Sequence, residues 1–272
     1  TSAQNWHTNF GPLARRFESV LHAAYGRPGE IAVSASNATS ALSACLIAHR
    51  LRGPILCPAF TFQATACAIL GAGCQPVIID VDPLTGVVRP DVLDAALSQT
   101  GAKAAMVLAP YGIATDFRSH AAICQRHGAR LIIDNAAGLG VLRDATDPAP
   151  HVDEVYSLHA TKPFGIGEGG AVFTAAAHDT ALRSAMNFGL LTHSATGQDQ
   201  AAYWGVNAKL TEVGAAIGLA VAKTMAERVR ARQGMAAEWM AALSGSGARV
   251  FCSRPDLSPW QVFPLMLPDE AS

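Results

Sequence analysis

The sequence predicts an α/β fold in which helices cover both faces of a sheet. Apolar runs of four to seven residues alternate with longer amphipathic segments, and this alternation is regular between residues 31 and 134. Short apolar runs are typical of strands buried on both faces, and the longer segments are typical of helices that connect neighbouring strands. The chain has 272 residues, half of them hydrophobic, which suffices for a sizeable core in one large domain or two small ones.

The elements follow from local patterns, taken in chain order. Asn37 is suited to cap the second helix, because its side chain can accept a backbone N–H, and Pro90 is suited to begin the fourth. The expected strands are Ile31–Ser34, Ile55–Cys57, Pro76–Val81, Ala104–Ala109, Leu131–Asp134, Val155–Leu158 and Ala171–Thr174. The expected helices are Gly11–Tyr25, Ala38–Arg50, Phe62–Leu70, Asp91–Leu97, Phe117–His127, Ala177–Phe188 and one long helix over Thr211–Leu243. A Ser-Gly-Ser-Gly stretch at 244–247 predicts a linker.

The composition excludes several classes of protein. Only 15% of the residues are charged, against about 25% in a typical globular domain, and the net charge is -1. The high hydrophobicity excludes disorder, and the lack of a basic excess argues against nucleic-acid binding. The low charge indicates either alanine richness or a surface buried against another chain. No signal peptide or membrane span is recognisable, so we expect a cytoplasmic protein.

Other motifs that carry chemistry are missing from the sequence. The six cysteines form no Cys-x-x-Cys pair and are interpreted as buried, reduced thiols. There is no metal-spaced cluster, no G-x-S-x-G elbow and no P-loop, so we expect no metal site. Gly165, Gly167 and Gly170 match G-x-G-x-x-G, but a strand follows them where a dinucleotide-binding motif needs a helix, so that interpretation is rejected.

The residues that follow the strands are where an open α/β sheet binds ligands. The small polar turn at 36–40 enters a helix, where free N–H groups cap the helix or bind an anion. Phe60 and Phe62 follow the second strand and either pack in the core or face a ligand. Asp134 ends an apolar strand, and a carboxylate there caps a turn or faces a cation or a protonated ring nitrogen.

Lysine is scarce, and this makes one lysine informative. The chain has four, of which Lys103 and Lys223 are expected to be solvated. Lys162 precedes a stretch with glycine at 165, 167, 169 and 170, which lets the backbone pack closely around a ligand. A desolvated lysine can lose its proton and form a Schiff base with a carbonyl compound.

Taken together, these segments resemble the DegT/DnrJ/EryC1/StrS family of pyridoxal-phosphate (PLP) aminotransferases of fold type I, which act mostly on nucleotide-linked keto sugars. The resemblance runs in order from residue 9 to about residue 223. The segments that carry it are Asn9–Pro12, Pro58–Phe62, Asp80–Asp82, Tyr111–Gly112, Asp134, Ser157–Lys162, Gly167–Gly170, Gly205–Asn207, Leu210–Glu212 and Ala215–Gly218. The lysine segment with its glycine loop is the most specific of them.

The resemblance implies PLP as cofactor and a role for each matching residue. Lys162 would hold PLP as a Schiff base and then carry the proton between substrate and cofactor. Asp134 would pair with the pyridinium nitrogen, so these two are the expected catalytic residues. The remaining expected cofactor-binding residues are Phe62 and Ala136 on the two ring faces, Ala38, Thr39 and Ser157 at the phosphate, and Asn207 reaching that phosphate from the second subunit of a homodimer with shared active sites.

The resemblance also implies a mixed, mostly parallel sheet sandwiched by helices, and it exposes departures from the family. Ala38 replaces a usual glycine, Ala137 a usual glutamine and Lys209 a usual arginine, which puts the substrate in doubt. Relatives continue past residue 265 into a C-terminal domain. We therefore expect a PLP-binding domain over 1–243 and the incomplete start of a small C-terminal domain over 244–272.

The function expected from the resemblance is transfer of an amino group from glutamate, or glutamine, to a keto group of a nucleotide-linked sugar. Two alternatives stay open. The acceptor is instead a cyclitol or another natural-product ketone, or the protein is a catalytically weak family member with a regulatory role. Lysine at 162 argues against the sugar dehydratases of the family, in which histidine takes that place.

Overall fold

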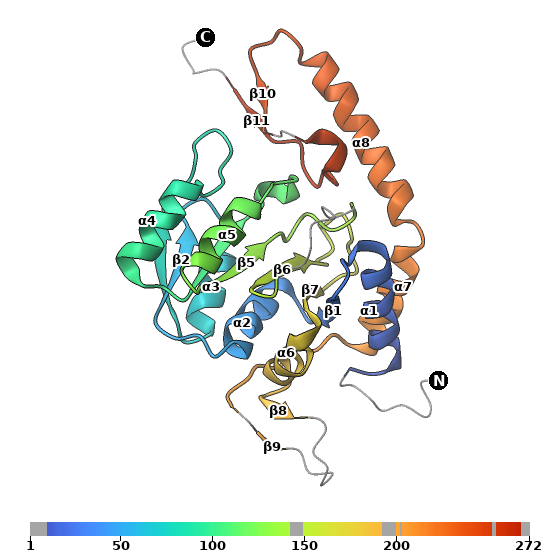
Figure 1. The fold of residues 1–272 in the computed structure, drawn as a ribbon. Helices are drawn as coiled ribbons and strands as arrows, with labels where there is room; N and C mark the ends of the chain where they lie inside the picture. Colours follow the sequence, from blue (N-terminus) through green and yellow to red (C-terminus); the bar gives the residue numbers. More distant parts are fainter. Residues whose placement is uncertain (1–9, 142–148, 192–199, 202, 252–253, 268–272) are drawn as a thin grey trace.

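Seven strands form one central sheet in the computed structural model, which describes residues 10–141, 149–191, 200–201, 203–251 and 254–267 (Figure 1). The strand order is β1-β7-β6-β5-β4-β2-β3. β7 runs antiparallel to β1 and β6, and every other adjacent pair is parallel. The strands are β1 (Glu30–Ala35), β2 (Pro54–Pro58), β3 (Gln75–Ile79), β4 (Ala104–Leu108), β5 (Arg130–Asp134), β6 (Val152–Ser157) and β7 (Gly170–Ala175). The predicted mixed, mostly parallel sheet is confirmed.

Helices cover both faces of this sheet (Figure 1). One face is packed by α2 (Ala38–Ala48), α3 (Gln63–Gly71) and α6 (Asp179–Met186). The other is packed by α1 (Pro12–Tyr25), α4 (Pro90–Thr100), α5 (Arg118–Arg126) and α7 (Glu212–Ala222). Consecutive residues of β5 show why the centre of this strand is apolar: Ile132 packs towards α2, whereas Leu131 and Ile133 pack on the α5 side.

A buried carboxylate links three strands at the edge of the sheet where the parallel strands β5 and β6 begin. Asp153 of β6 accepts hydrogen bonds from His49 Nε2 (2.9 Å), Thr174 Oγ1 (2.6 Å) and the Arg130 guanidinium (3.2 Å). Burial by itself raises the pKa of this carboxyl, but the His49 hydrogen bond and the Arg130 charge outweigh it and hold the pKa at about 2. These contacts link β5, β6 and β7 to the residue after α2, and so help to align them.

The structure corrects the prediction of one helix over 211–243. Two helices occupy this region, α7 and α8 (Met225–Ala242), and they are separated at Lys223 and Thr224. Thr224 has a φ of -110° and its hydroxyl donates to the Val221 carbonyl, so the chain turns without glycine or proline to signal it. The predicted helix at 177–188 is also shorter, because a 3₁₀ turn (Ala176–His178) precedes α6.

Four short strands were not predicted. They form two small antiparallel sheets, β8 (Leu190–Leu191) with β9 (Gln200–Ala201), and β10 (Arg249–Val250) with β11 (Leu265–Met266). With two residues each, they are too short for a periodicity to show. The division of the chain at residue 243 stays a prediction.

The described cysteines are free. Cys45, Cys57, Cys74 and Cys124 are buried as expected, whereas Cys67 is exposed on α3, and Cys252 lies outside the described residues. Among the helices described, none combines the length and the apolar character that crossing a membrane requires.

Candidate active site

A cavity of about 710 Å³ lies where the parallel strands end. It is lined by residues that follow β1, β2, β4, β5 and β6, together with Gln261 and Val262 from the C-terminal segment. Its size is ordinary for a site that binds a small molecule. Seven of the eight residues expected to bind or act on a cofactor line it: Ala38, Thr39, Phe62, Asp134, Ala136, Ser157 and Lys162.

Lys162 lies on the loop between β6 and β7, which folds back on itself. The N–H of Leu158 donates to the Gly169 carbonyl (2.8 Å), and the N–H of Ala160 to the Gly167 carbonyl (2.7 Å). The buried Phe164 anchors this loop in the core. Lys162 is half-buried, and burial lowers its pKa while the Asp134 charge partly offsets that effect. The loop therefore presents a lysine that loses its proton more readily than an exposed one.

Asp134 is almost fully buried, with 3% of its surface exposed. Thr65 Oγ1 donates to its Oδ2 (2.7 Å), and the Ala136 N–H donates to its Oδ1 (3.2 Å). Burial raises the pKa of this carboxyl, and these hydrogen bonds and the Lys162 charge oppose the rise. The carboxylate thus caps a turn and also lines the cavity, where a cation beside it would offset its loss of hydration.

The start of α2 lines the cavity, and its backbone arrangement suits an anion. Asn37 caps the helix as predicted, accepting the Ser40 N–H at its Oδ1 (2.8 Å). The N–H groups of Ala38 and Thr39, at the first helical positions, have no acceptor among the described residues. A side chain at Gly170 would put its Cβ 2.7 Å from the Asn37 carbonyl carbon, so glycine there lets the helix start approach β7. Ser157, at the end of β6, faces the same cavity.

The walls of the cavity differ in character. Phe62, directly before α3, is 78% exposed and Phe60 is 41% exposed, so the interpretation that these rings pack in the core is wrong. Ala136 offers a methyl group, and its carbonyl accepts the Ser157 N–H (3.0 Å). A flat ring could lie between an aromatic side chain and this small residue.

Asn207 is the one expected residue that does not line the cavity of its own chain. It is exposed, it pairs with Asn187 in an isolated β-bridge, and its Oδ1 accepts a hydrogen bond from Lys209 (2.7 Å). The Lys209 ammonium also lies 4.5 Å from the centre of the Phe188 ring. These contacts place Asn207 on an outer surface.

Three further residues, two that line the cavity and one that lies behind it, were not predicted from the sequence. Thr65 holds Asp134 from 69 positions away, and Gln261 accepts a hydrogen bond from the Lys162 amine (3.2 Å). Tyr111 lines the cavity with 42% of its surface exposed, and it packs edge-on against Phe60 and Phe251. Only Tyr111 belongs to a motif noted in the sequence, and no local signal points to the other two.

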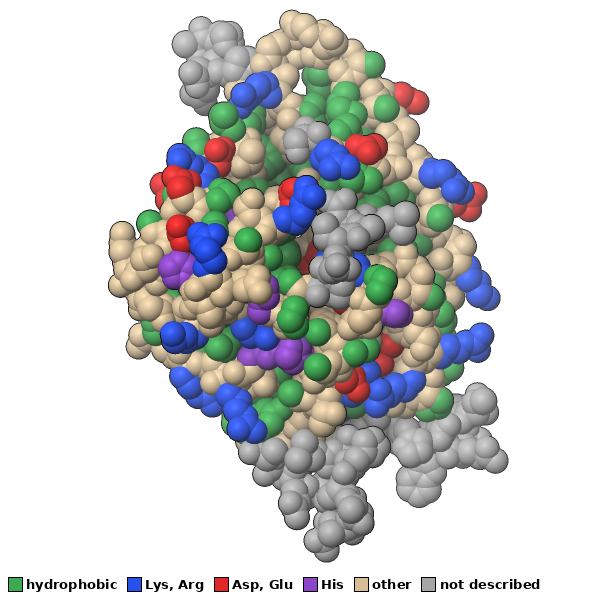
Figure 2. Space-filling model, in the orientation of Figure 1, with side chains coloured by type: hydrophobic (Ala, Val, Ile, Leu, Met, Phe, Trp, Pro, Cys, Tyr) green, Lys and Arg blue, Asp and Glu red, His purple; other side chains and the backbone are tan. Residues whose placement is uncertain are grey.

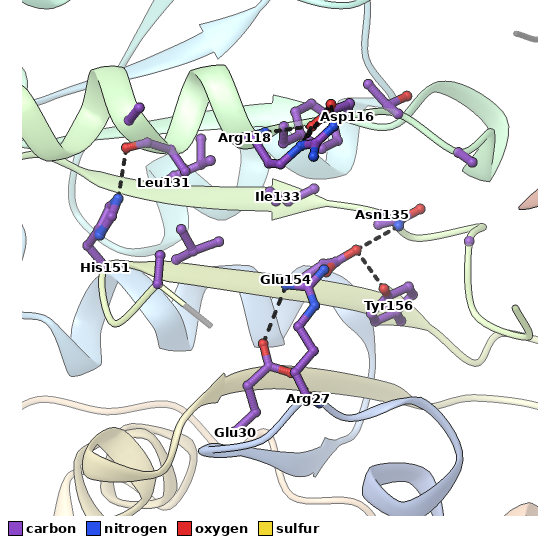
Figure 3. Close-up of a pocket in the computed structure, with 18 of the residues that line it drawn as sticks. Arg27, Glu30, Asp116, Arg118, Leu131, Ile133, Asn135, His151, Glu154 and Tyr156 are labelled. Atoms are coloured by element: carbon purple, nitrogen blue, oxygen red, sulfur yellow. Dashed lines mark hydrogen bonds and ion pairs between the residues drawn. The ribbon is translucent and has the colours of Figure 1, made fainter. Parts of the chain in front are cut away.

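A second cavity, of about 540 Å³, lies under α5 on the face of the sheet opposite α2 (Figure 3). Its central carboxylate, Glu154, accepts hydrogen bonds from Asn135 (2.8 Å) and the Tyr156 hydroxyl (2.6 Å), and Arg27 lies 3.9 Å from it. These polar side chains bind one another, and no lysine lines this cavity among the residues described. The larger cavity is therefore the better candidate for chemistry.

Two observations concern metal ions and polyanions as ligands. Among the described residues, no group of three or more His, Cys, Asp or Glu side chains is placed to hold a metal ion. On the face shown in Figure 2, basic side chains are interspersed with acidic and apolar ones.

The chain is similar to several proteins of known sequence or structure. The chain is 31% identical over 245 residues to a UDP-2-acetamido-2-deoxy-3-oxo-D-glucuronate aminotransferase of Pseudomonas aeruginosa, covering 87% of this chain and 65% of that protein. It is similar to the crystal structure of DesI in the presence of its TDP-sugar product (TM-score 0.82, 32% identity, 99% of this chain and 67% of that one). It is also similar to the Bacillus subtilis NtdA structure with bound cofactor PMP (TM-score 0.83, 25% identity, 96% and 60%).

The family assignment rests on the whole sequence. The chain spans 44 to 65% of the length of curated relatives that it matches. Residues 1–272 match the family described as DegT/DnrJ/EryC1/StrS aminotransferases. This chain therefore belongs to the DegT/DnrJ/EryC1/StrS aminotransferase family.

Proposed function

We propose that this chain carries the active site of a PLP-dependent aminotransferase that moves an amino group from an amino acid to a keto group of a nucleotide-linked sugar. One observation carries the proposal: a desolvated lysine, a buried carboxylate and the unpartnered start of a helix face one cavity. These groups fit, respectively, the aldehyde, the ring nitrogen and the phosphate of PLP. Family membership and the cofactor-bound relative support the same cofactor.

Each end of the cavity suits one part of the cofactor. The N–H groups of Ala38 and Thr39 would bind the phosphate, with the Ser157 hydroxyl as a further donor. Phe62 would cover one face of the ring and Ala136 the other. Asp134, oriented by Thr65, would accept the ring N–H and keep that nitrogen protonated.

Lys162 would have two successive roles. Because burial lowers its pKa, a larger fraction of its amine is neutral than in an exposed lysine, and this form would hold PLP at its aldehyde carbon, with loss of water. Once free of the cofactor, the Lys162 amine would remain in the cavity, where it would carry a proton between the substrate carbon and the cofactor. Bound PLP supplies an electron sink for the charge left on that carbon.

The rim of the cavity supports a nucleotide-linked acceptor. Phe60 and Tyr111 are partly exposed there, and rings of this kind pack against a nucleobase or the apolar face of a sugar. Two of the relatives support this: the Pseudomonas aeruginosa aminotransferase is named for a UDP-linked sugar, and DesI was crystallised in the presence of its TDP-sugar product. Ala137 lines the same cavity and offers no polar group where the family resemblance implies glutamine, which keeps a cyclitol or another ketone as the alternative acceptor.

A two-stage spectroscopic experiment tests the proposal. With PLP added, the protein should show the violet absorption band of a lysine-bound cofactor, and the amino donor alone should convert the cofactor to its amine form and remove the band. Glutamate and glutamine are compared as donors, and UDP- and dTDP-linked keto sugars are compared with inososes as acceptors. Failure to form the band contradicts the proposed function, and turnover of inososes alone selects the cyclitol alternative.

Asn207 leads to a separate expectation about assembly. It is exposed outside its own cavity, which supports the proposal that it reaches the phosphate in a partner's site within a homodimer. Lys162→Ala and Asn207→Ala should each be inactive alone. A 1:1 mixture that has exchanged subunits should recover about a quarter of wild-type activity, because half of the dimers then contain one intact site. No recovery after proven exchange, or a fully active monomer on light scattering, contradicts a shared site.

A further inference from the structure

The C-terminal segment contributes a side chain to the reactive lysine. Gln261 lies between the 3₁₀ turn Pro255–Leu257 and β11, and its Oε1 accepts a hydrogen bond from Lys162 Nζ at 3.2 Å. This is the one hydrogen bond of that amine within the part of the chain that the structure describes. Since Gln261 lines the cavity, a residue 99 positions away meets the lysine inside the site.

The backbone around Gln261 is held in an unusual conformation. The preceding residue, Trp260, has a φ of +53°, which bulky L residues rarely adopt. Its ring is buried, stacks on Phe263 with centroids 5.3 Å apart, and donates from Nε1 to the Pro255 carbonyl (3.0 Å). Arg232 of α8 donates to the Trp260 carbonyl (2.8 Å). Strained backbone that its surroundings hold in place is typical of functional sites.

Two further contacts fix the segment to the rest of the molecule. The N–H of Ala114, which follows β4, donates to Ser258 Oγ (3.2 Å), and Gln233 of α8 donates to the Asp256 carbonyl (2.7 Å). The anchoring is thus done by the backbone and by residues 256, 258 and 260. The side chain of Gln261 takes no part in it and is directed to the Lys162 amine.

We propose that Gln261 is a positioning residue for Lys162, whose ammonium group it binds through its side-chain carbonyl whenever that group is free of the cofactor. This inference rests on the proposed function. An ammonium group has three donors and no acceptor, so a carbonyl suits it. Because the amide is neutral, it holds the ammonium in place without adding the charge that would keep it protonated.

Other charged and titratable groups share the cavity with Lys162 and contribute to any pH dependence measured there. Asp134 is the charge that acts on the amine from β5. His159 and Glu168, on the same loop as Lys162, face each other at 3.6 Å, and Tyr111 lies across the cavity. These groups are unchanged in variants of residue 261, so a shift between those variants reports on residue 261.

The test measures the rate at which cofactor-free protein captures PLP as a function of pH, followed by the violet absorption band. The pH midpoint reports the pKa of Lys162, because only the neutral amine reacts. Gln261→Leu should lower the midpoint, since it removes an acceptor that favours the ammonium. Gln261→Glu should raise it by about one unit, and so slow capture about tenfold at pH 7. Val262→Ala, a neighbouring apolar change at the cavity, should leave the midpoint in place.

A second measurement is independent of PLP. Reductive methylation with formaldehyde and a mild hydride donor, read by mass spectrometry, gives the pH midpoint of each lysine. The Lys162 midpoint should move in opposite directions in the Leu and Glu variants, while those of Lys103 and Lys223 stay constant. Equal midpoints at Lys162 in all variants, or shifts in the same direction, overturn the role of Gln261. Failure of the wild type to capture PLP, with the methylation shifts present, instead contradicts the proposed function alone.

Discussion

Replacing Lys162 with alanine is expected to lower amino-group transfer by a factor of about 10³ or more. The variant loses both the amine that bonds to the cofactor and the group that carries the proton. The violet absorption band with PLP should be missing, although the phosphate and ring contacts remain available. Absorption spectroscopy and a coupled transfer assay measure the two effects.

The fold should survive this change. The Lys162 side chain is only half-buried, and its loop is held by backbone hydrogen bonds and by the buried Phe164. Urea unfolding should therefore give a midpoint close to that of the wild type. Lys223→Ala is the matched control, because Lys223 is an exposed lysine that follows α7 outside the cavity. A band that persists in Lys162→Ala would contradict the role of this lysine.

Replacing Asp134 with asparagine is expected to lower the rate of transfer by about 10²–10³-fold. The change keeps the shape of the side chain but removes the charge that would hold the ring nitrogen protonated. Steady-state kinetics with saturating PLP measures the loss. Asp91→Asn, at an exposed carboxylate of α4, is the control and should change little.

Asp134 also gives a direction for the pH dependence of cofactor binding. Burial raises the pKa of this carboxyl above that of an exposed aspartate. The ionised form pairs with a ring cation, so PLP affinity should fall as the pH falls through that raised pKa, and should be retained at higher pH. Equilibrium binding across the acid range measures this, and in Asp134→Asn the loss should be absent. A loss of the same size in both proteins would assign it to another group.

Replacing Thr65 should lower the rate of transfer less than replacing Asp134, because Thr65 acts through Asp134. Its hydroxyl is the side-chain donor to that carboxylate, and Thr65→Val removes it while keeping the shape. Loss of one hydrogen bond to a charged group is expected to lower the rate of transfer about tenfold. This loss is well below the one expected for Asp134→Asn.

The residues predicted from the sequence were those that stand in contiguous motifs at strand ends. Asp134 and Ser157 are the last residues of β5 and β6, and Lys162 lies in the loop that follows β6. Parallel strands bring their carboxyl ends to one edge of a sheet. The cap at Asn37 was predictable for the same reason, because capping depends on residues only three apart.

The residues that the sequence did not reveal make contacts across long separations. Thr65 and Gln261 meet their partners over 69 and 99 positions, and an isolated threonine or glutamine carries no pattern. The break between α7 and α8 falls at Lys223 and Thr224, which are residues that a helix tolerates. The core-packing interpretation of Phe60 and Phe62 failed because burial depends on what lies opposite a ring in space.

The sequence by itself determined the α/β architecture, the family and the lysine on which the proposed chemistry rests, because each depends on periodicity or on neighbouring residues. The tertiary structure decided which of two cavities holds that lysine, what holds Asp134 beside it, and that the C-terminal segment reaches it. Packing of distant segments sets the burial and hydrogen bonds that shift a pKa, and these contacts do not exist until the chain is folded.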